Sequence, residues 1–311
     1  MKYRVVDGHC DTPVELWLRK ERLEESTCQV SLRRAEALVG YTQFYAFCTV
    51  WQQDEDTFEA RYEKALSYFE GQLAESRGRI VCCGTEQDAR RAMDSGKCGA
   101  FLSIEGAEAI ACDPGKLELA HARGIRMIAP TWNFENALAG SCMTGGGLTA
   151  QGKEFVRRAQ RLGIIIDVSH ISERAFWDIC DIAEKPIVAS HSNARAVCSH
   201  ARNLSDEQFR AICQLGGTAG LNLYGAFLKD EGGVTLEDVW RHIAHFLELG
   251  GEGHIALGGD LDGCDVLPAG FAGVESYALL AKTLEEKKLS TAVIQNIFSE
   301  SILKVVKQCT M

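Results

Sequence analysis

GIIIDVSHISERAFWDICDIAEKPIVASHS (residues 163–192) is the stretch that decides the fold. It begins and ends with short apolar runs, at residues 164–166 and 187–189, of the kind found in strands that are buried on both faces. Between these runs, Ser172 can cap an amphipathic helix over residues 173–183. A strand, a helix and a second strand in this order are typical of a βαβ unit with parallel strands.

The same alternation continues in both directions along the chain. Amphipathic stretches separate short apolar runs, and capping signals such as Thr149 and Ser205 mark helix starts. The eight predicted strands cover residues 3–9, 42–49, 99–105, 125–132, 164–170, 186–191, 217–224 and 255–260. Eight βα repeats predict an α/β fold, the closed (β/α)8 TIM barrel. No Gly-x-Gly-x-x-Gly turn follows the first strand, which argues against a dinucleotide-binding fold.

One segment interrupts the regular alternation between the second and third strands. Residues 51–97 are predicted to form a helix over 56–75, a brief strand at 80–83 and a second helix that begins at Thr85. No Pro- or Ser-rich linker and no repeat divides the chain. We therefore expect a single domain over residues 1–311, with a helical insertion after the second strand.

Composition and charge restrict the class of partner. The 33 basic residues are outnumbered by 43 acidic ones, and the formal charge of −10 argues against nucleic acid or an anionic membrane as partner. No run approaches the roughly 18 apolar residues of a membrane span. The 13 cysteines include no CxxC pair, which favours buried, reduced thiols over a disulfide framework. With no apolar core of a signal peptide near residue 1, we expect a cytoplasmic protein.

Residue types that bind metals recur where the predicted strands end. His9 and Asp11 lie two positions apart, so that in an extended chain their side chains point to the same face. Glu105, His170 and His191 end the third, fifth and sixth strands. Because the active site of such a barrel forms at the carboxyl ends of its strands, these side chains should meet. Imidazole and carboxylate ligands together predict a binuclear site for divalent cations.

Asp260, at the end of the eighth strand, is placed to exchange a proton with water at this site. Each of the six residues alone is more often a hydrogen-bonded core or turn residue, so the prediction rests on their common position. The remaining histidines are interpreted without a metal. His242 and His245 are predicted to lie on a solvated helix face. The others, in helix or loop contexts, are His121, His200 and His254.

Six motifs place these residues in a recognisable order along essentially the whole chain. They are Asp-Gly-His-Cys-Asp-Thr-Pro (7–13), Ile-Glu-Gly (104–106), Asp-Val-Ser-His (167–170), Ser-His-Ser-Asn (190–193), Arg-Asn-Leu-Ser-Asp-Glu-Gln (202–208) and Gly-Gly-Asp-Leu-Asp-Gly (258–263). The chain resembles the renal, or membrane, dipeptidase family of zinc peptidases, and this resemblance implies a (β/α)8 barrel with two Zn²⁺ per chain. One zinc would be held by His9, Asp11 and Glu105. The second would be held by His170, His191 and the same Glu105, which bridges the pair.

The resemblance also implies how a dipeptide is bound and hydrolysed. Arg202 would receive the free carboxylate, while Asp260 would contact the amino end and transfer protons. A hydroxide bridging the two zincs, with Glu105 among its supports, would attack the peptide carbonyl, including that of dipeptides with a C-terminal D-residue. Trp132 is a departure, because it stands where the family has a histidine that contacts substrate and assists the oxyanion. A homodimer is compatible with the resemblance.

Two other functions fit the same residues. One is a binuclear metal hydrolase of another small amide or lactam, or of a phosphoester; the other is a barrel that binds a metal or ligand without catalysis. An arginine that reads a carboxylate, as predicted for Arg202, favours an amino-acid or peptide end. Manganese, iron or cobalt would suit the same ligands as zinc. The glycine-rich segment 140–147 is predicted to form a lid or rim of the pocket.

Overall fold

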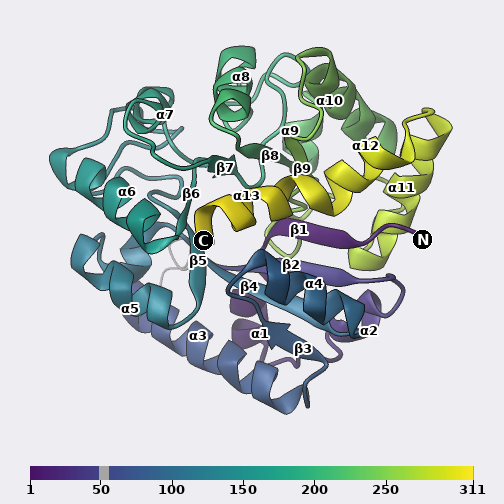
Figure 1. The fold of residues 1–311 in the computed structure, drawn as a ribbon, viewed down its shortest axis with the longest axis horizontal. Coiled ribbons are helices and arrows are strands. Elements are labelled where there is room, and N and C mark those ends of the chain that lie inside the picture. Colours follow the sequence, from purple (N-terminus) through teal and green to yellow (C-terminus); the bar gives the residue numbers. More distant parts are fainter. Residues whose placement is uncertain (49–55, 311) are drawn as a thin grey trace.

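Eight parallel strands close into a barrel in the computed structural model, which describes residues 1–48 and 56–310 (Figure 1). The ring consists of β1 (Val5–Cys10), β2 (Tyr41–Cys48), β4 (Cys98–Glu105), β5 (Ile125–Ala129), β6 (Ile165–Asp167), β7 (Ile187–Ala189), β8 (Thr218–Leu221) and β9 (Ile255–Leu257). Each strand pairs with the next one in this order, and β9 pairs with β1 to close the ring. The predicted (β/α)8 barrel is confirmed.

The predicted insertion also exists, between β2 and β4. It contains α3 (Phe58–Glu75), β3 (Ile80–Cys82) and α4 (Glu86–Asp94). Strand β3 pairs only with the first residues of β4, where β5 has not yet begun, so it adds a short strand outside the ring. The predicted end of the second strand at Thr49 and the start of the insertion at residues 51–55 lie outside the described residues.

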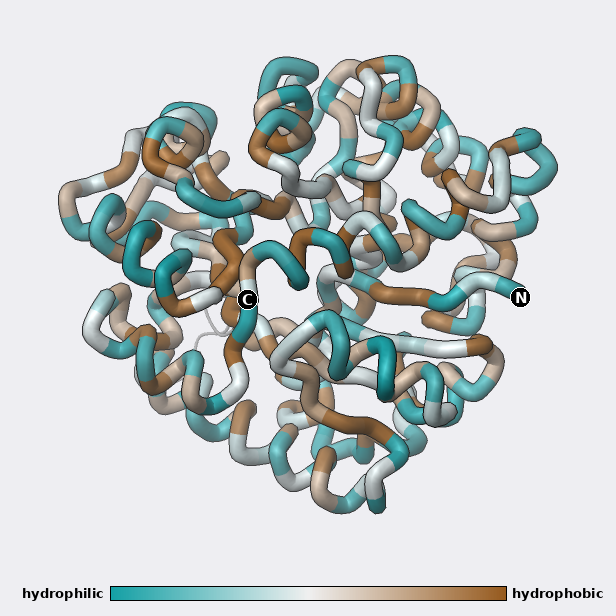
Figure 2. The backbone as a smooth tube through the Cα atoms, viewed as in Figure 1, coloured by the Kyte–Doolittle hydropathy of each residue, from teal (hydrophilic) through white to brown (hydrophobic). Residues whose placement is uncertain are grey.

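Helices cover the outside of the barrel (Figure 1). They are α1 (Thr12–Arg19), α2 (Leu32–Ala35), α5 (Leu117–Ala122), α6 (Ala150–Leu162), α7 (Glu173–Cys180), α8 (Asp206–Gln214), α9 (Gly225–Leu228), α10 (Leu236–Glu248), α11 (Tyr277–Glu286), α12 (Thr291–Gln295) and α13 (Ser301–Thr310). Figure 2 shows the hydrophobic residues gathered along the strands and hydrophilic ones on the outer turns of the helices. No helix in the described part of the chain is long and apolar enough to cross a membrane.

Helix α13 closes the amino end of the barrel. Its Ile302, Val305 and Val306 join a buried apolar cluster with inward side chains of the strands, among them Phe44 and Phe101. Near its end, the Cys309 carbonyl accepts a hydrogen bond of 2.7 Å from Lys185 Nζ, just before β7. Because this end is filled with apolar side chains, only the carboxyl ends of the strands can open onto a polar site.

Several predicted boundaries were wrong at the carboxyl ends. Strands β5 to β9 end two or three residues earlier than predicted, so Trp132, His170, His191 and Asp260 lie in loops that follow the strands. Helix α7 likewise ends at Cys180 rather than at residue 183. The apolar pattern continues into these loops because the loops are themselves buried. Helix starts were predicted better, since Thr149 and Ser205 cap α6 and α8 through their side-chain oxygens.

Candidate metal centre

The six residues predicted at strand ends meet at the carboxyl end of the barrel. His9 belongs to β1, and Glu105 is the last residue of β4. Asp11 precedes α1, and the others follow β6, β7 and β9 in loops. All six side chains are nearly or fully buried, with Asp260 the most exposed at 9%. Barrel closure thus brings together side chains that are up to 251 positions apart in the sequence.

Glu105 lies between two groups of ligand atoms. Its Oε2 is 3.6 Å from His9 Nε2, which lies 3.8 Å from Asp11 Oδ1. Its Oε1 is 2.7 Å from His170 Nε2 and 3.3 Å from His191 Nε2. The two carboxylate oxygens therefore face different imidazoles, the arrangement that a bridging ligand of two cations requires.

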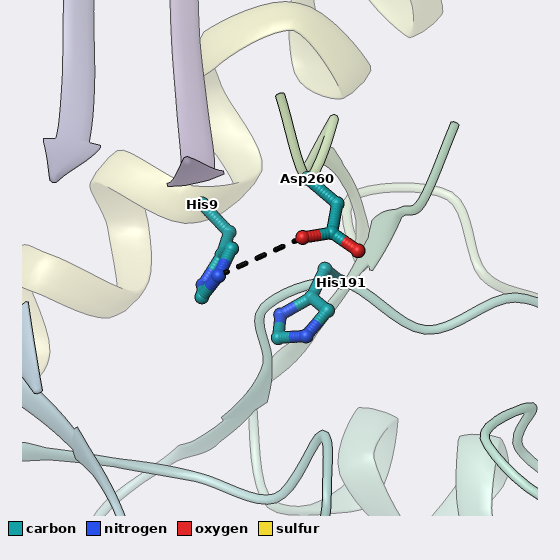
Figure 3. A group of neighbouring side chains, drawn as sticks. All are labelled: His9, His191 and Asp260. Atoms are coloured by element: carbon teal, nitrogen blue, oxygen red, sulfur yellow. Dashed lines mark ion pairs between the residues drawn. The ribbon is translucent and has the colours of Figure 1, made fainter. Parts of the chain in front are cut away.

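Asp260 is the sixth member of the same cluster. Its Oδ1 is 3.9 Å from His9 Nε2, and Figure 3 shows these two side chains and His191 pointing toward one another. Three groups of ligand atoms, each within 4.8 Å, can be drawn from the described residues: His9–Asp11–Glu105, Glu105–His170–His191 and His9–His191–Asp260. Asp260 has a positive φ of 56°, so its backbone takes the left-handed conformation that is uncommon outside glycine.

The donor set fits divalent cations. His9 Nε2 and Asp11 Oδ1 are buried and have no hydrogen-bond partner among the described residues. A buried polar atom without a partner costs about 1–3 kcal/mol, and a cation between these two atoms would satisfy both. Nitrogen and carboxylate oxygen are the ligands that zinc and other transition metals prefer.

Burial and neighbouring charges shift the pKa values of the clustered carboxyl and imidazole groups in different directions. Burial raises the pKa of the Asp11 carboxyl to about 8, and the nearby negative charge of Glu105 adds to the rise. Burial would also raise the pKa of Glu105, but His9 and His170 hold it well below its usual value. Burial and the positive charge of Arg202 lower the pKa of His170 to about 3, which favours the neutral imidazole that can bind a metal.

Hydrogen bonds from residues that the sequence analysis did not single out hold these side chains in place. Asn133 Oδ1 lies 2.9 Å from His170 Nδ1, and Asn222 Nδ2 donates to Asp260 Oδ2 at 2.9 Å. Asp7, fully buried, accepts hydrogen bonds from the backbone N–H of His9 and from Tyr277. Asn133 and Asn222 carried no sequence signal beyond a polar residue next to an apolar run, which many turns share, whereas Asp7 begins the motif at residues 7–13.

Arg202 lies beside the cluster, as predicted. It is only 5% exposed, and its Nη2 is 3.0 Å from His170 Nε2. The ring of Phe227 lies 5.5 Å below the guanidinium carbon. This contact with an aromatic face and the burial of the chain hold the planar donor fork in one orientation.

A cavity of about 430 Å³ opens onto the cluster. Arg202 and Trp132 line it, as do Tyr224, Phe227 and His200. His200 had been interpreted as a loop residue without a role, but its Nδ1 accepts a hydrogen bond of 3.2 Å from the Arg202 backbone N–H. The exposed Met143 lines the mouth, so the glycine-rich segment 140–147 contributes to the rim.

The interpretation of His242 was wrong. This side chain does not face solvent but is fully buried, with Nδ1 accepting from the Ala194 backbone N–H at 3.1 Å and Nε2 3.0 Å from the Leu228 carbonyl. The helical pattern showed which residues of α10 share a face. It did not show that the segments after β7 and β8, with Ala194 and Leu228, cover that face. His245 is partly exposed and lies 2.7 Å from Asp206.

A parallel (β/α)8 barrel with this cluster at its carboxyl end belongs to the class of metal-dependent hydrolases. The particular family follows from the sequence: residues 1–311 match the model of the membrane dipeptidase family, peptidase family M19. The chain belongs to this family, as its motifs had indicated. It is a metallo-dipeptidase, a hydrolase whose family implies a divalent metal and a dipeptide substrate.

Individual relatives are similar to this chain over most of its length. An uncharacterised protein from the pqqA 5′ region of Klebsiella pneumoniae is 36% identical over 247 residues, which are 76% of this chain and 91% of that protein. The crystal structure of dipeptidase AC, a metallopeptidase of family M19, superposes with a TM-score of 0.89 at 28% identity. A metallopeptidase from Rhodobacter sphaeroides, liganded with a phosphinate mimic of the dipeptide L-Ala-D-Ala, does so with a TM-score of 0.88 at 28% identity. Both alignments cover 99% of each chain.

Proposed function

We propose that this chain, a single domain over residues 1–311, is a zinc-dependent dipeptidase that uses two Zn²⁺. The observation that carries the proposal is the position of Glu105, whose two oxygens face His9 on one side and His170 with His191 on the other. His9, Asp11 and Glu105 would hold the first cation. Glu105, His170 and His191 would hold the second.

Bound cations supply Lewis-acid polarisation of the peptide carbonyl and lower the pKa of a water molecule toward neutrality. The side chains of the barrel supply the rest. Asp260 Oδ2 is held by Asn222, which leaves Oδ1 directed at the cluster to accept a proton and pass it to the leaving amine. Asp260 also serves as the partner for the amino end of the substrate.

Arg202 is the proposed partner for the free carboxylate at the other end of the substrate. Its guanidinium can donate hydrogen bonds to both carboxylate oxygens in a bidentate pair. Because Arg202 lies within hydrogen-bond distance of His170, a peptide bound there has room for few atoms between its carboxylate and the metals. This limit favours dipeptides. The phosphinate mimic of L-Ala-D-Ala on the Rhodobacter sphaeroides relative supports extending the substrate range to C-terminal D-residues.

Trp132 is proposed to shape the pocket next to the scissile bond. Its ring centroid is 6.2 Å from that of His170, on the cavity wall. An indole N–H can donate one hydrogen bond but cannot exchange a proton. Trp132 is therefore also the observation that favours the second candidate, hydrolysis of another small amide or lactam.

A metal analysis combined with a panel of dipeptides tests the proposal. The purified protein loaded with Zn²⁺ should contain two zincs per chain and hydrolyse L,L- and L,D-dipeptides, and a chelator should abolish this activity. N-acetylated and C-amidated dipeptides and small lactams serve as controls. The protein could instead bind two zincs, leave every dipeptide intact and cleave a lactam or an N-acyl amino acid. That result would contradict the dipeptidase and favour the second candidate.

A cytoplasmic location is also proposed. Described cysteines such as Cys28, Cys83 and Cys112 are free thiols, and burial raises the pKa of each to about 12. Free thiols of this kind are typical of a reducing compartment. The expectation of buried thiols holds for most of them, although Cys82 is exposed. The homodimer stays a prediction, which sedimentation velocity would test.

A further inference from the structure

Behind His191, on the side away from the cavity, a buried carboxylate gathers four hydrogen bonds. Asp167, the last residue of β6, is 3% exposed. Its Oδ1 accepts from Ser169 N at 3.0 Å, Ser169 Oγ at 2.6 Å and Ser190 N at 3.0 Å. Its Oδ2 accepts from Ser190 Oγ at 2.5 Å. Four donors around one carboxylate stabilise its ionised form.

The direction of each hydrogen bond follows from counting hydrogens. An ionised carboxylate only accepts, so the single hydroxyl hydrogen of Ser190 is directed at Asp167. Ser190 Oγ must then accept in its contact with His191 Nδ1 at 2.7 Å. The third contact of Ser190 Oγ, with Ser169 Oγ at 3.2 Å, is left without a hydrogen because both hydroxyls donate to Asp167. His191 therefore carries its hydrogen on Nδ1. Its Nε2 presents a lone pair toward Glu105 Oε1, 3.3 Å away, which is the orientation that a metal ligand needs.

Ser169 contacts the same carboxylate but holds a different part of His191. Its hydroxyl hydrogen is directed at Asp167 Oδ1, and its oxygen accepts from the His191 backbone N–H at 3.2 Å. Ser190 therefore controls the imidazole ring, whereas Ser169 controls the backbone. Both positions carry the same side chain and both are buried, so substitutions of the two serines can be compared directly.

We propose that Asp167 and Ser190 are positioning residues, a carboxylate acting through a serine hydroxyl, that set the tautomer and ring orientation of His191 for metal binding. The inference rests on the proposed binuclear function, and it identifies the residues that set the zinc affinity of the second cation position. The other imidazole of that position is held differently, since the partner of His170 Nδ1 is the neutral amide of Asn133. The two histidines thus have different hydrogen-bond partners at Nδ1, and only that of His191 leads to a charged carboxylate.

Zinc competition with a chromogenic chelator tests the serine. Ser190→Ala removes the acceptor of the Nδ1 hydrogen and should weaken binding of the second Zn²⁺ by about 10–100-fold, the usual effect of losing such a support. Ser169→Ala removes one donor to the same carboxylate, leaves the contact with the ring intact and should change the affinity only a few-fold. Equal losses in the two variants would assign a merely structural role to both serines and overturn the proposal, as would an unchanged affinity in Ser190→Ala at a normal Tm.

Asp167→Asn gives a second, independent readout. The amide that replaces the carboxylate can donate to Ser190 Oγ, whose hydrogen then turns toward His191 Nδ1 and shifts the imidazole hydrogen to Nε2. ¹⁵N NMR of histidine-labelled, zinc-free protein should show the Nδ1–H form of His191 in the wild type and the Nε2–H form in Asp167→Asn. A wild-type His191 with its hydrogen on Nε2 would refute the inference.

This NMR measurement also separates the two proposals. It reports the hydrogen on His191 whether or not dipeptides are cleaved or a second zinc binds. Failure of the dipeptidase assay with the expected tautomer would reject the proposed function alone, whereas active enzyme with the wrong tautomer would reject only the positioning role.

Discussion

At the scale of single residues, the candidate metal centre includes two buried polar atoms, His9 Nε2 and Asp11 Oδ1, that have no hydrogen-bond partner among the described residues. In the proposed site, His170 is one of the two imidazoles at the second cation position, in the group Glu105–His170–His191. We expect His170→Ala to bind fewer than two zincs per chain, measured by elemental analysis after dialysis. His245→Ala, a change at a partly exposed helix position, is the control and should keep both. An unchanged zinc content in His170→Ala would contradict the ligand assignment.

Arg202 gives a second prediction at this scale. Arg202→Ala should raise KM for dipeptides by about 10- to 200-fold, because losing a buried bidentate carboxylate partner costs about 1.5–3 kcal/mol. Its effect on kcat should be smaller, since the guanidinium is not a reacting group. Steady-state kinetics on a dipeptide and on its C-terminal amide provide the check. If KM rises equally for both substrates, Arg202 does not bind the carboxylate.

At the scale of elements, glycines decide how closely β7, β8 and β9 approach. A Cβ at Gly258 would lie 1.8 Å from the Ser190 carbonyl oxygen, and one at Gly220 would lie 1.9 Å from the same atom. The backbone of β8 and the residues just after β7 and β9 therefore meet next to His191. This close approach is possible only because neither position carries a side chain.

Two glycine substitutions with opposite expected effects follow from this packing. Gly258→Ala should lower the free energy of unfolding by about 3 kcal/mol or more, because the backbone must move to admit the methyl group. Gly71→Ala lies within α3, where a new Cβ would meet nothing within 4 Å, and it should stabilise by about 0.5–1 kcal/mol. Urea unfolding monitored by circular dichroism measures both. A stable Gly258→Ala would show that the strands can separate without loss.

Helix caps were the best-predicted local feature. Ser205 and Gln208 form a reciprocal capping box at the start of α8, and Thr149 caps the start of α6 as predicted, while Gly163 ends α6 in the left-handed conformation. These signals act within four or five residues, so they are present in the sequence whatever the rest of the chain does. The ends of β6, β7 and β9 were predicted less well because buried loops prolong the apolar pattern.

At the scale of the whole molecule, the two ends of the barrel are different environments. The amino end is filled by α13 and apolar side chains, and the carboxyl end collects carboxylates and imidazoles around one cavity. Barrel closure forces these charges together, which is unfavourable unless cations compensate them. Metal binding should therefore stabilise the entire fold.

Metal removal tests this linkage. Chelation should lower the Tm, and zinc in about 100-fold excess over its dissociation constant should restore roughly 2.7 kcal/mol for each site. Differential scanning calorimetry of metal-free and reloaded protein measures the difference. Magnesium at the same concentration is the control, since it binds poorly to imidazole. A Tm that does not respond to zinc would mean that the cluster holds no metal.

The sequence by itself determined the alternation of strands and helices and the chemistry of the six clustered residues. Both are local properties: hydrophobic periodicity is complete within one element, and His9 with Asp11 or a lone Glu105 after an apolar run can be recognised within a few positions. The residues that the structure brings together in this cluster could therefore be predicted before any distance was known.

Only the tertiary structure decided what surrounds each of these side chains. Three examples depend on which atoms come within about 3 Å of one another after the barrel closes. His242 is covered by the segment that contains Ala194, and Asn222 holds Asp260. Asp167 reaches His191 through Ser190. Hydrogen bonds are directional and short-ranged, so displacements far smaller than one residue decide them. No periodicity in the sequence records positions at that precision.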